Sequence, residues 1–107
     1  MKYRSKLESL GFRYVKYKNR FEKGNLSLDL ENMVAYSYEW YRIYEKINGK
    51  HVVDTFAYSK TTSRHMTEMM RVISRVFDVP VVDQVRIEAP HGLANLKAAV
   101  QLYKDRI

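Results

Sequence analysis

The chain has 107 residues, of which 46% are hydrophobic and 29% charged, and its formal net charge is +7. This composition is typical of one globular domain and excludes a disordered chain, while no apolar run approaches the ~20 residues of a membrane span. The absence of cysteine excludes disulfides and thiolate chemistry. We therefore expect a single domain over residues 1–107, no membrane span and a cytoplasmic location.

The first predicted elements are a short helix over residues 2–10, ending at Gly11, and an aromatic strand over 12–18. Residues 1–23 contain eight basic and two acidic residues, whereas the other 84 residues contain 11 and 10. This asymmetry predicts contact with nucleic acid, a membrane surface or an acidic partner; the alternative is a solubilising surface. The candidates for nucleic-acid binding in this segment are Lys2, Arg4, Lys6, Arg13, Lys16, Lys18 and Arg20.

The middle of the chain is predicted to form strands. Residues 26–30 alternate with period two, and residues 33–47 form the longest β-like run. Asn48-Gly49 is a strong hairpin signal, and the returning strand over 50–58 would place Tyr44 opposite Val53. Both faces of this hairpin are mixed, so the pattern leaves open which face is buried. Aromatic residues dominate interface hot spots, so the candidates for binding a partner are Tyr38, Trp40 and Tyr41.

A helix after residue 58 carries an apolar stripe at 66, 69, 70, 73, 76 and 77, and ends before Pro80. Arg64, Arg71 and Arg75 lie on its opposite side and join the candidates for nucleic-acid binding. Its first turn offers free backbone N–H groups, so a candidate anion site is formed there. Its residues are Thr61, Thr62, Ser63, Arg64 and His65. The alternative is that the hydroxyl residues here only cap the helix, with Ser59, Thr61 or Thr62 as the cap.

Residues 81–89 are ambiguous, with a short strand predicted over 85–87, and a last helix is predicted from Pro90 to Ile107. The element order indicates an α+β fold: an antiparallel sheet of about four strands, with a long Asn-Gly hairpin, packed by two or three helices.

Catalytic motifs are not evident in the sequence. The histidines are His51, His65 and His91, and no pair has metal-ligand spacing. The glycines are scattered, so no phosphate loop is present. We therefore assign no catalytic residue, metal or cofactor, and favour a protein that is not an enzyme.

One segment resembles a known pattern. Residues 35–41 (AYSYEWY), 47–49 (ING) and 58–65 (YSKTTSRH) resemble small uncharacterised proteins of tailed bacteriophages. The resemblance implies a phage product acting in bacterial cytoplasm, and it implies no activity. Residues 41–45 with the returning strand are also similar to the core hairpin of RelE-type ribonuclease toxins. The two helices that should precede the sheet are missing or reduced to one here, and the usual basic residue that ends the return strand is absent.

Three functions remain open. The first is non-enzymatic binding of nucleic acid or a host nucleoprotein through a basic surface. The second is a protein–protein inhibitor, for counter-defence or host takeover, that uses the aromatic hairpin; homodimerisation would use the same surface. The third is a metal-independent ribonuclease, in which His65 or His51 moves protons and Arg42 or Arg64 binds the phosphate.

Overall fold

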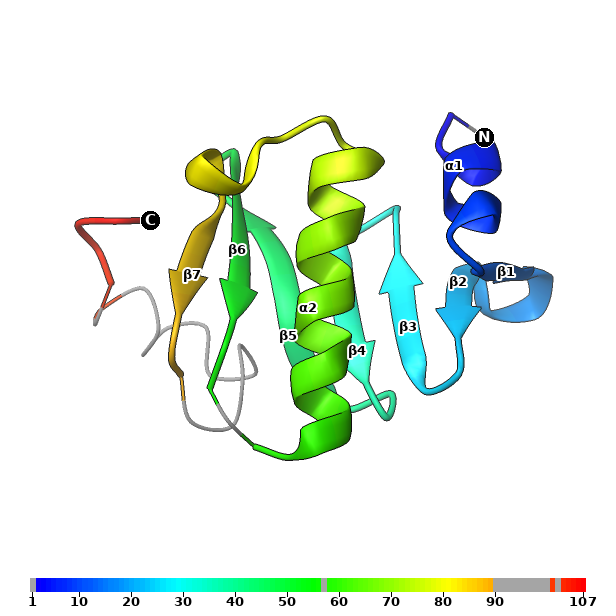
Figure 1. Ribbon diagram of the computed structural model, residues 1–107, viewed down its shortest axis with the longest axis horizontal. Helices are drawn as coiled ribbons and strands as arrows, with labels where there is room; N and C mark the ends of the chain where they lie inside the picture. Colours follow the sequence, from blue (N-terminus) through cyan, green and yellow to red (C-terminus); the bar gives the residue numbers. More distant parts are fainter. Residues whose placement is uncertain (1, 57, 90–100, 102) are drawn as a thin grey trace.

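The computed structural model describes residues 2–56, 58–89, 101 and 103–107, and within them it shows an α+β fold (Figure 1). Two α-helices and seven strands are present in this part of the chain. The helices are α1 (Arg4–Ser9) and α2 (Lys60–Arg75), and the 3₁₀ turns are η1 (Lys16–Lys18) and η2 (Val81–Asp83). The strands are β1 (Arg13–Val15), β2 (Arg20–Lys23), β3 (Leu26–Asp29), β4 (Val34–Ser37), β5 (Tyr41–Ile47), β6 (Lys50–Asp54) and β7 (Val85–Ile87).

The seven strands form one sheet in the order of the chain, from β1 to β7. Every neighbouring pair is antiparallel except β6 and β7, which are parallel. Helix α2 connects these two strands and packs on β4, β5 and β6, so the end of the sheet is a βαβ unit. The predicted number of strands, about four, is therefore too low, although the predicted α+β class is confirmed.

The predicted hairpin is present between β5 and β6. Asn48 and Gly49 have φ of 53° and 78°, and Tyr44 pairs with Val53 as expected. The run over 33–47 is nevertheless two strands, because the chain turns at residues 38–40. Tyr38 and Glu39 adopt φ of 56° and 66° there, a conformation that neither residue type favours. The predicted partner strand over 50–58 ends at Asp54.

Strand β2 occupies a polar segment between the predicted strands over 12–18 and 26–30, for which the sequence predicts no strand. Phe21 is fully buried and pairs with Leu28 of β3, so this short strand completes a β2–β3 hairpin around Gly24. One buried aromatic residue among charges gives too little periodicity to reveal a four-residue strand.

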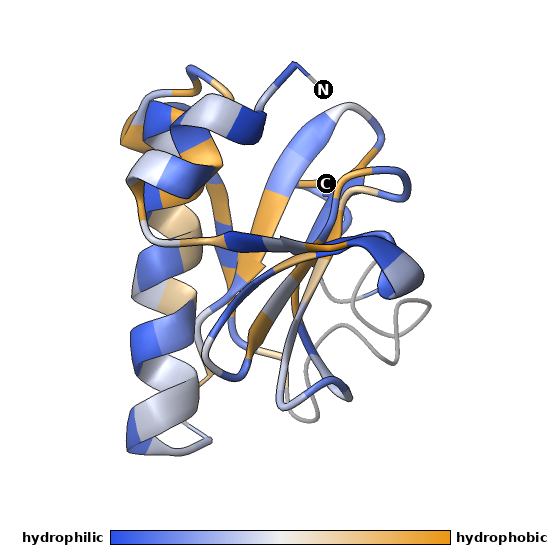
Figure 2. Cartoon of the chain, turned by 90° about the vertical axis from the view of Figure 1, so that its right-hand side faces the viewer, coloured by the Kyte–Doolittle hydropathy of each residue, from blue (hydrophilic) through white to orange (hydrophobic). Residues whose placement is uncertain are grey.

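Both helices cover the same face of the sheet, and Figure 2 shows them together on one side. The core lies between them and the sheet and includes Leu7 of α1, Tyr41 and Tyr44 of β5, and Met69 and Ile73 of α2. A smaller cluster on the other face contains Ile47, Val52, Ile87 and Ala89. The predicted last helix falls largely on residues 90–100, outside the described part of the chain.

Candidate functional site

The surface formed by the two helices carries most of the net charge. We call it the helical face: α1 and α2 with their immediate flanks, and Lys23 of β2, which reaches α2. Residues 60, 64, 68, 71 and 75 follow helical spacing and form one stripe along α2. The face has a net charge of +5 out of the chain's +7. Its basic residues are Lys2, Arg4, Lys6, Lys23, Lys60, Arg64, Arg71 and Arg75, and its acidic residues are Glu8, Glu68 and Asp78.

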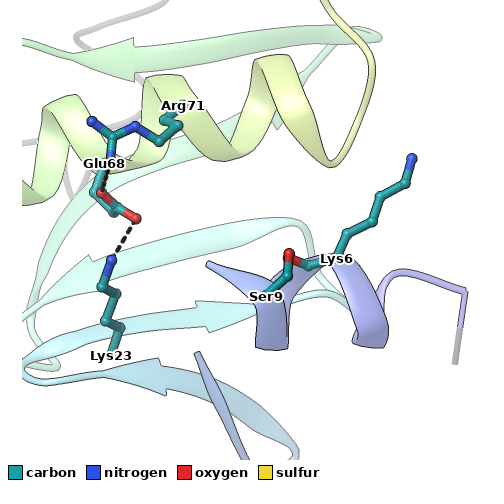
Figure 3. A network of polar contacts seen from close by, with 5 residues as sticks. All are labelled: Lys6, Ser9, Lys23, Glu68 and Arg71. Atoms are coloured by element: carbon teal, nitrogen blue, oxygen red, sulfur yellow. Dashed lines mark hydrogen bonds and ion pairs between the residues drawn. The ribbon is translucent and has the colours of Figure 1, made fainter. Parts of the chain in front are cut away.

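A groove of about 400 Å³ lies between α2 and the β2–β3 turn. Glu68 ties its two walls together, because one carboxylate oxygen lies 2.9 Å from Nζ of Lys23 and the other 3.2 Å from a guanidinium nitrogen of Arg71 (Figure 3). Two cations share one carboxylate, so the network keeps a positive charge. The groove is lined by Lys23, Gly24, Asn25, Leu26, Thr61, Arg64, His65 and Glu68.

His65 is held in the groove by a buried chain of hydrogen bonds. Its Nδ1 lies 2.7 Å from Oγ of Ser37, and that oxygen lies 3.0 Å from Oγ1 of Thr62. Ser37 and Thr62 are fully buried, so neither hydroxyl is accessible to a ligand. Burial, and then the neighbouring Arg64, lower the pKa of His65, so the imidazole is neutral near pH 7.

The predicted anion site at the start of α2 is only partly assembled. Ser59 is the cap, and its hydroxyl accepts the N–H of Thr62 at 3.1 Å. Thr61, Arg64 and His65 line the groove. Ser63 lies instead in a wide depression of about 720 Å³, together with Ser59, Lys60 and Arg64. The five residues therefore do not converge on one point, and Thr62 belongs to the core.

The predicted N-terminal basic surface is divided by the sheet. Lys2, Arg4 and Lys6 belong to the helical face, whereas Arg13 and Arg20 lie on the opposite face, which we call the open face. Lys16 and Lys18 lie in η1 at the edge. Several of these cations are also paired with acids: Arg4 with Glu8 at 3.3 Å, Lys6 with Asp78 at 3.6 Å, Lys18 with Glu39 at 2.6 Å and Arg20 with Asp29 at 3.8 Å.

The open face has nearly balanced charges. The ring of Tyr36 has the guanidinium groups of Arg20 and Arg42 at 5.1 and 5.6 Å from its centroid. Arg42 is paired with Glu45 at 2.7 Å. At the edge, hydrogen bonding to Lys18 lowers the pKa of Glu39. This face therefore offers little net attraction for a polyanion, and most of the excess positive charge lies on the helical face.

The aromatic candidates separate into surface and core. Tyr38 and Trp40 are 43% and 55% exposed, whereas Tyr41 is fully buried and packs under α2. The prediction that Tyr41 binds a partner at the surface is therefore wrong, because its ring is buried in the core. Tyr58, which the sequence did not single out, is 51% exposed, and its ring centroid lies 5.8 Å from that of Trp40.

His51 is also a core residue. Its Nδ1 lies 2.7 Å from the hydroxyl of Tyr44, and its ring stacks on Phe77. Burial lowers the pKa of His51. Arg42 lies on the open face, away from the groove, so the structure brings together only His65 and Arg64 of the predicted ribonuclease residues. His91 lies outside the described residues.

Among the described residues, no group of three or more His, Asp or Glu side chains is placed to hold a metal ion. In the same part of the chain, no helix has the length and apolar character that crossing a membrane requires.

The chain shows no significant match to a family model, a curated protein or a solved structure. The residues Lys23, Asn25 and Glu68 of the groove were missed by sequence reasoning. Lys23 and Glu68 are 45 positions apart in the chain, so no local pattern could have paired them.

Proposed function

We propose that this protein is a non-enzymatic nucleic-acid-binding protein that holds the phosphate backbone on its helical face. The observation that supports this proposal is the concentration of net charge: +5 of +7 lies on the side formed by α1 and α2. Electrostatic attraction to phosphates supplies most of the affinity in sequence-independent binding. The resemblance of residues 35–65 to tailed-phage proteins makes a phage-encoded factor in the host cytoplasm part of the proposal.

The stripe along α2 has the dimensions of a phosphate track. Residues 60 to 75 span about 22 Å of helix at 1.5 Å per residue. The stripe presents four cations over this length, Lys60, Arg64, Arg71 and Arg75, and each can neutralise a phosphate of a strand that lies along the helix. Lys23 extends the positive charge sideways into the groove, where it pairs with Glu68. Arginine suits this role because its planar guanidinium can donate two hydrogen bonds to one phosphate.

The test compares two double variants that each remove two positive charges. In Arg64→Gln/Arg75→Gln both charges are lost from the helical face; in Arg13→Gln/Lys16→Gln they are lost from exposed positions outside it. We expect the first variant to bind an oligonucleotide more weakly and to reduce the slope of log K against log salt by about two, one for each phosphate contact. The second variant should keep the slope of the unmodified protein.

Equal losses in both double variants would mean that only the total charge matters, and the helical face would not be the site. Failure of the unmodified protein to bind any nucleic acid at low salt would refute nucleic-acid binding itself.

Ribonuclease activity is the second candidate, because His65 and Glu68 line the same groove as Lys23 and Arg64. Positioned side chains that transfer protons can catalyse phosphodiester cleavage, and neighbouring cations can hold the phosphate. The lowered pKa of His65 leaves a neutral imidazole, and Glu68 is held as an ion-paired carboxylate. Near pH 7 a neutral imidazole can accept a proton but is a poor proton donor for the leaving group. The groove therefore favours binding over cleavage.

We therefore expect RNA to stay intact when it is incubated with the protein at neutral pH and analysed on a denaturing gel. Cleavage of RNA but not of DNA, abolished in His65→Ala and retained in His51→Ala, would instead support the ribonuclease.

A further inference from the structure

Three exposed aromatic side chains gather at the start of α2. Trp40 lies in the turn between β4 and β5, and its ring contacts Tyr58, which directly precedes the helix cap. Tyr58 also contacts buried Tyr41, with ring centroids 4.7 Å apart, so the cluster is anchored on the core. Tyr38, from the same turn as Trp40, packs against His65, with centroids 5.9 Å apart. We call Tyr38, Trp40 and Tyr58 the aromatic patch.

The aromatic patch adjoins the positive end of the helical face. Tyr58 is followed by Ser59 and Lys60, where a wide depression opens that Arg64 also lines. On its other side, Tyr38 contacts His65, a wall of the groove. A ligand on the stripe of α2 would therefore reach aromatic rings at one end. A cationic track that ends in exposed rings is the arrangement by which proteins hold unpaired nucleotides.

The turn that presents the patch is held in an unusual conformation. Tyr38 and Glu39 both have positive φ, which is rare for residues with large side chains. The N–H of Tyr38 donates to the carbonyl of Asn25 at 2.8 Å, and Glu39 is paired with Lys18 at 2.6 Å. These contacts fix the turn from both sides. Strained backbone that the surroundings hold in place is concentrated at binding sites.

We propose that the ligand is single-stranded nucleic acid, whose bases stack on Trp40 and Tyr58 while its phosphates follow Lys60 and Arg64 along α2. This inference rests on the proposed function and specifies the form of the nucleic acid. In a duplex, the faces of the bases are occupied by their neighbours, so the aromatic patch adds nothing to duplex binding. A single strand exposes every base face, and stacking adds to the electrostatic attraction.

Trp40 gives a direct readout, because it is the one tryptophan of the chain. The probes are a single-stranded oligothymidylate and a hairpin duplex with the same number of phosphates. We expect the single strand to quench the tryptophan fluorescence and to bind more tightly than the duplex. Trp40→Ala should weaken single-strand binding by about 5- to 100-fold and leave duplex binding unchanged. Trp40→Phe should keep most of the affinity, since it keeps a ring.

The matched control is Tyr17→Ala, which removes a tyrosine that is 85% exposed in η1, outside the patch. Tyr17→Ala should change the affinity for neither the single strand nor the duplex. Thermal unfolding of each variant checks that the fold is kept.

Equal, salt-dependent binding of both probes with unchanged fluorescence would overturn this inference and leave the proposed function intact. Binding of neither probe would overturn both. A third outcome is that the aromatic patch binds a second copy of this chain. Light scattering would then give a mass of twice 12.7 kDa for the unmodified protein and 12.7 kDa for Trp40→Ala. This result would identify the patch as a dimer interface and overturn the inference.

Discussion

Asp54→Asn is expected to make the protein more stable at pH 7 and to remove a pH dependence of its stability. Asp54 ends β6 and is fully buried. Its Oδ1 accepts the N–H groups of Phe56 and Ala89 at 2.9 and 3.1 Å, whereas Oδ2 is buried with no hydrogen-bond partner among the described residues. Burial raises the pKa of Asp54 from 3.8 to about 6, against the opposing effect of the two N–H groups.

The raised pKa fixes the direction of the effect. Between pH 3.8 and about 6 the folded protein holds a proton on Asp54 that the unfolded chain has lost, so the stability from this group falls as the pH rises. The full difference between these two pKa values corresponds to roughly 3 kcal/mol. Asparagine keeps an acceptor for both N–H groups without the buried charge, at the cost of an unpaired amide. Because the unpaired amide offsets part of this difference, the net gain at pH 7 is about 1–2 kcal/mol.

The measurement is the free energy of unfolding in urea at pH 4 and at pH 7 for both proteins. Subtracting the unfolding free energy of the unmodified protein from that of the variant isolates Asp54 from the other carboxylates. This difference should increase by a few kcal/mol from pH 4 to pH 7, because only the unmodified protein loses stability from Asp54. Asp83→Asn, an exposed change in η2, is the control and should alter stability by about 0.5 kcal/mol or less. A difference that is the same at both pH values would show that Asp54 titrates normally.

The elements that could be predicted are those whose signal is local. The stripe of α2 repeats over four turns, Ser59 is a cap that its residue type favours, and Asn48-Gly49 specifies a tight turn by its tolerance of positive φ. Each of these depends on residues close together in the chain. The α+β class follows from them.

The rest depends on long-range contacts. The turn at Tyr38 and Glu39 is held by Asn25 and Lys18, so nothing within residues 33–47 indicates that the run is broken. The parallel pairing of β7 with β6 is fixed only when α2 packs on the sheet. The charge asymmetry of residues 1–23 was visible, but the sheet separates Lys6 from Arg20 and places them on opposite faces. Of the cations predicted to bind nucleic acid, those that share the helical face are therefore Lys2, Arg4, Lys6, Arg64, Arg71 and Arg75.

Leu7→Ala is expected to lower the free energy of unfolding by about 3–5 kcal/mol. It should also weaken nucleic-acid binding, although Leu7 touches no ligand in the proposed complex. Helix α1 has six residues, which is too short to be stable alone. Leu7 is fully buried and anchors it to the core, and the ring of Tyr3 packs edge-on against Phe77 with centroids 5.1 Å apart. Removing the Leu7 side chain leaves a cavity at the centre of this contact.

Weaker binding follows because α1 places Lys2, Arg4 and Lys6 on the helical face. If α1 detaches while the sheet and α2 stay folded, amide exchange should become fast in residues 4–9 and stay slow in α2. The salt dependence of binding should fall at the same time. Leu10→Ala is the matched control, because Leu10 is only partly buried at the end of the same helix. Leu10→Ala should lower the free energy of unfolding by less than Leu7→Ala does, and it should leave the salt dependence of binding unchanged. Slow exchange in α1 of the Leu7→Ala protein, with weakened binding, would mean that the affinity loss has another cause than the placement of these three cations.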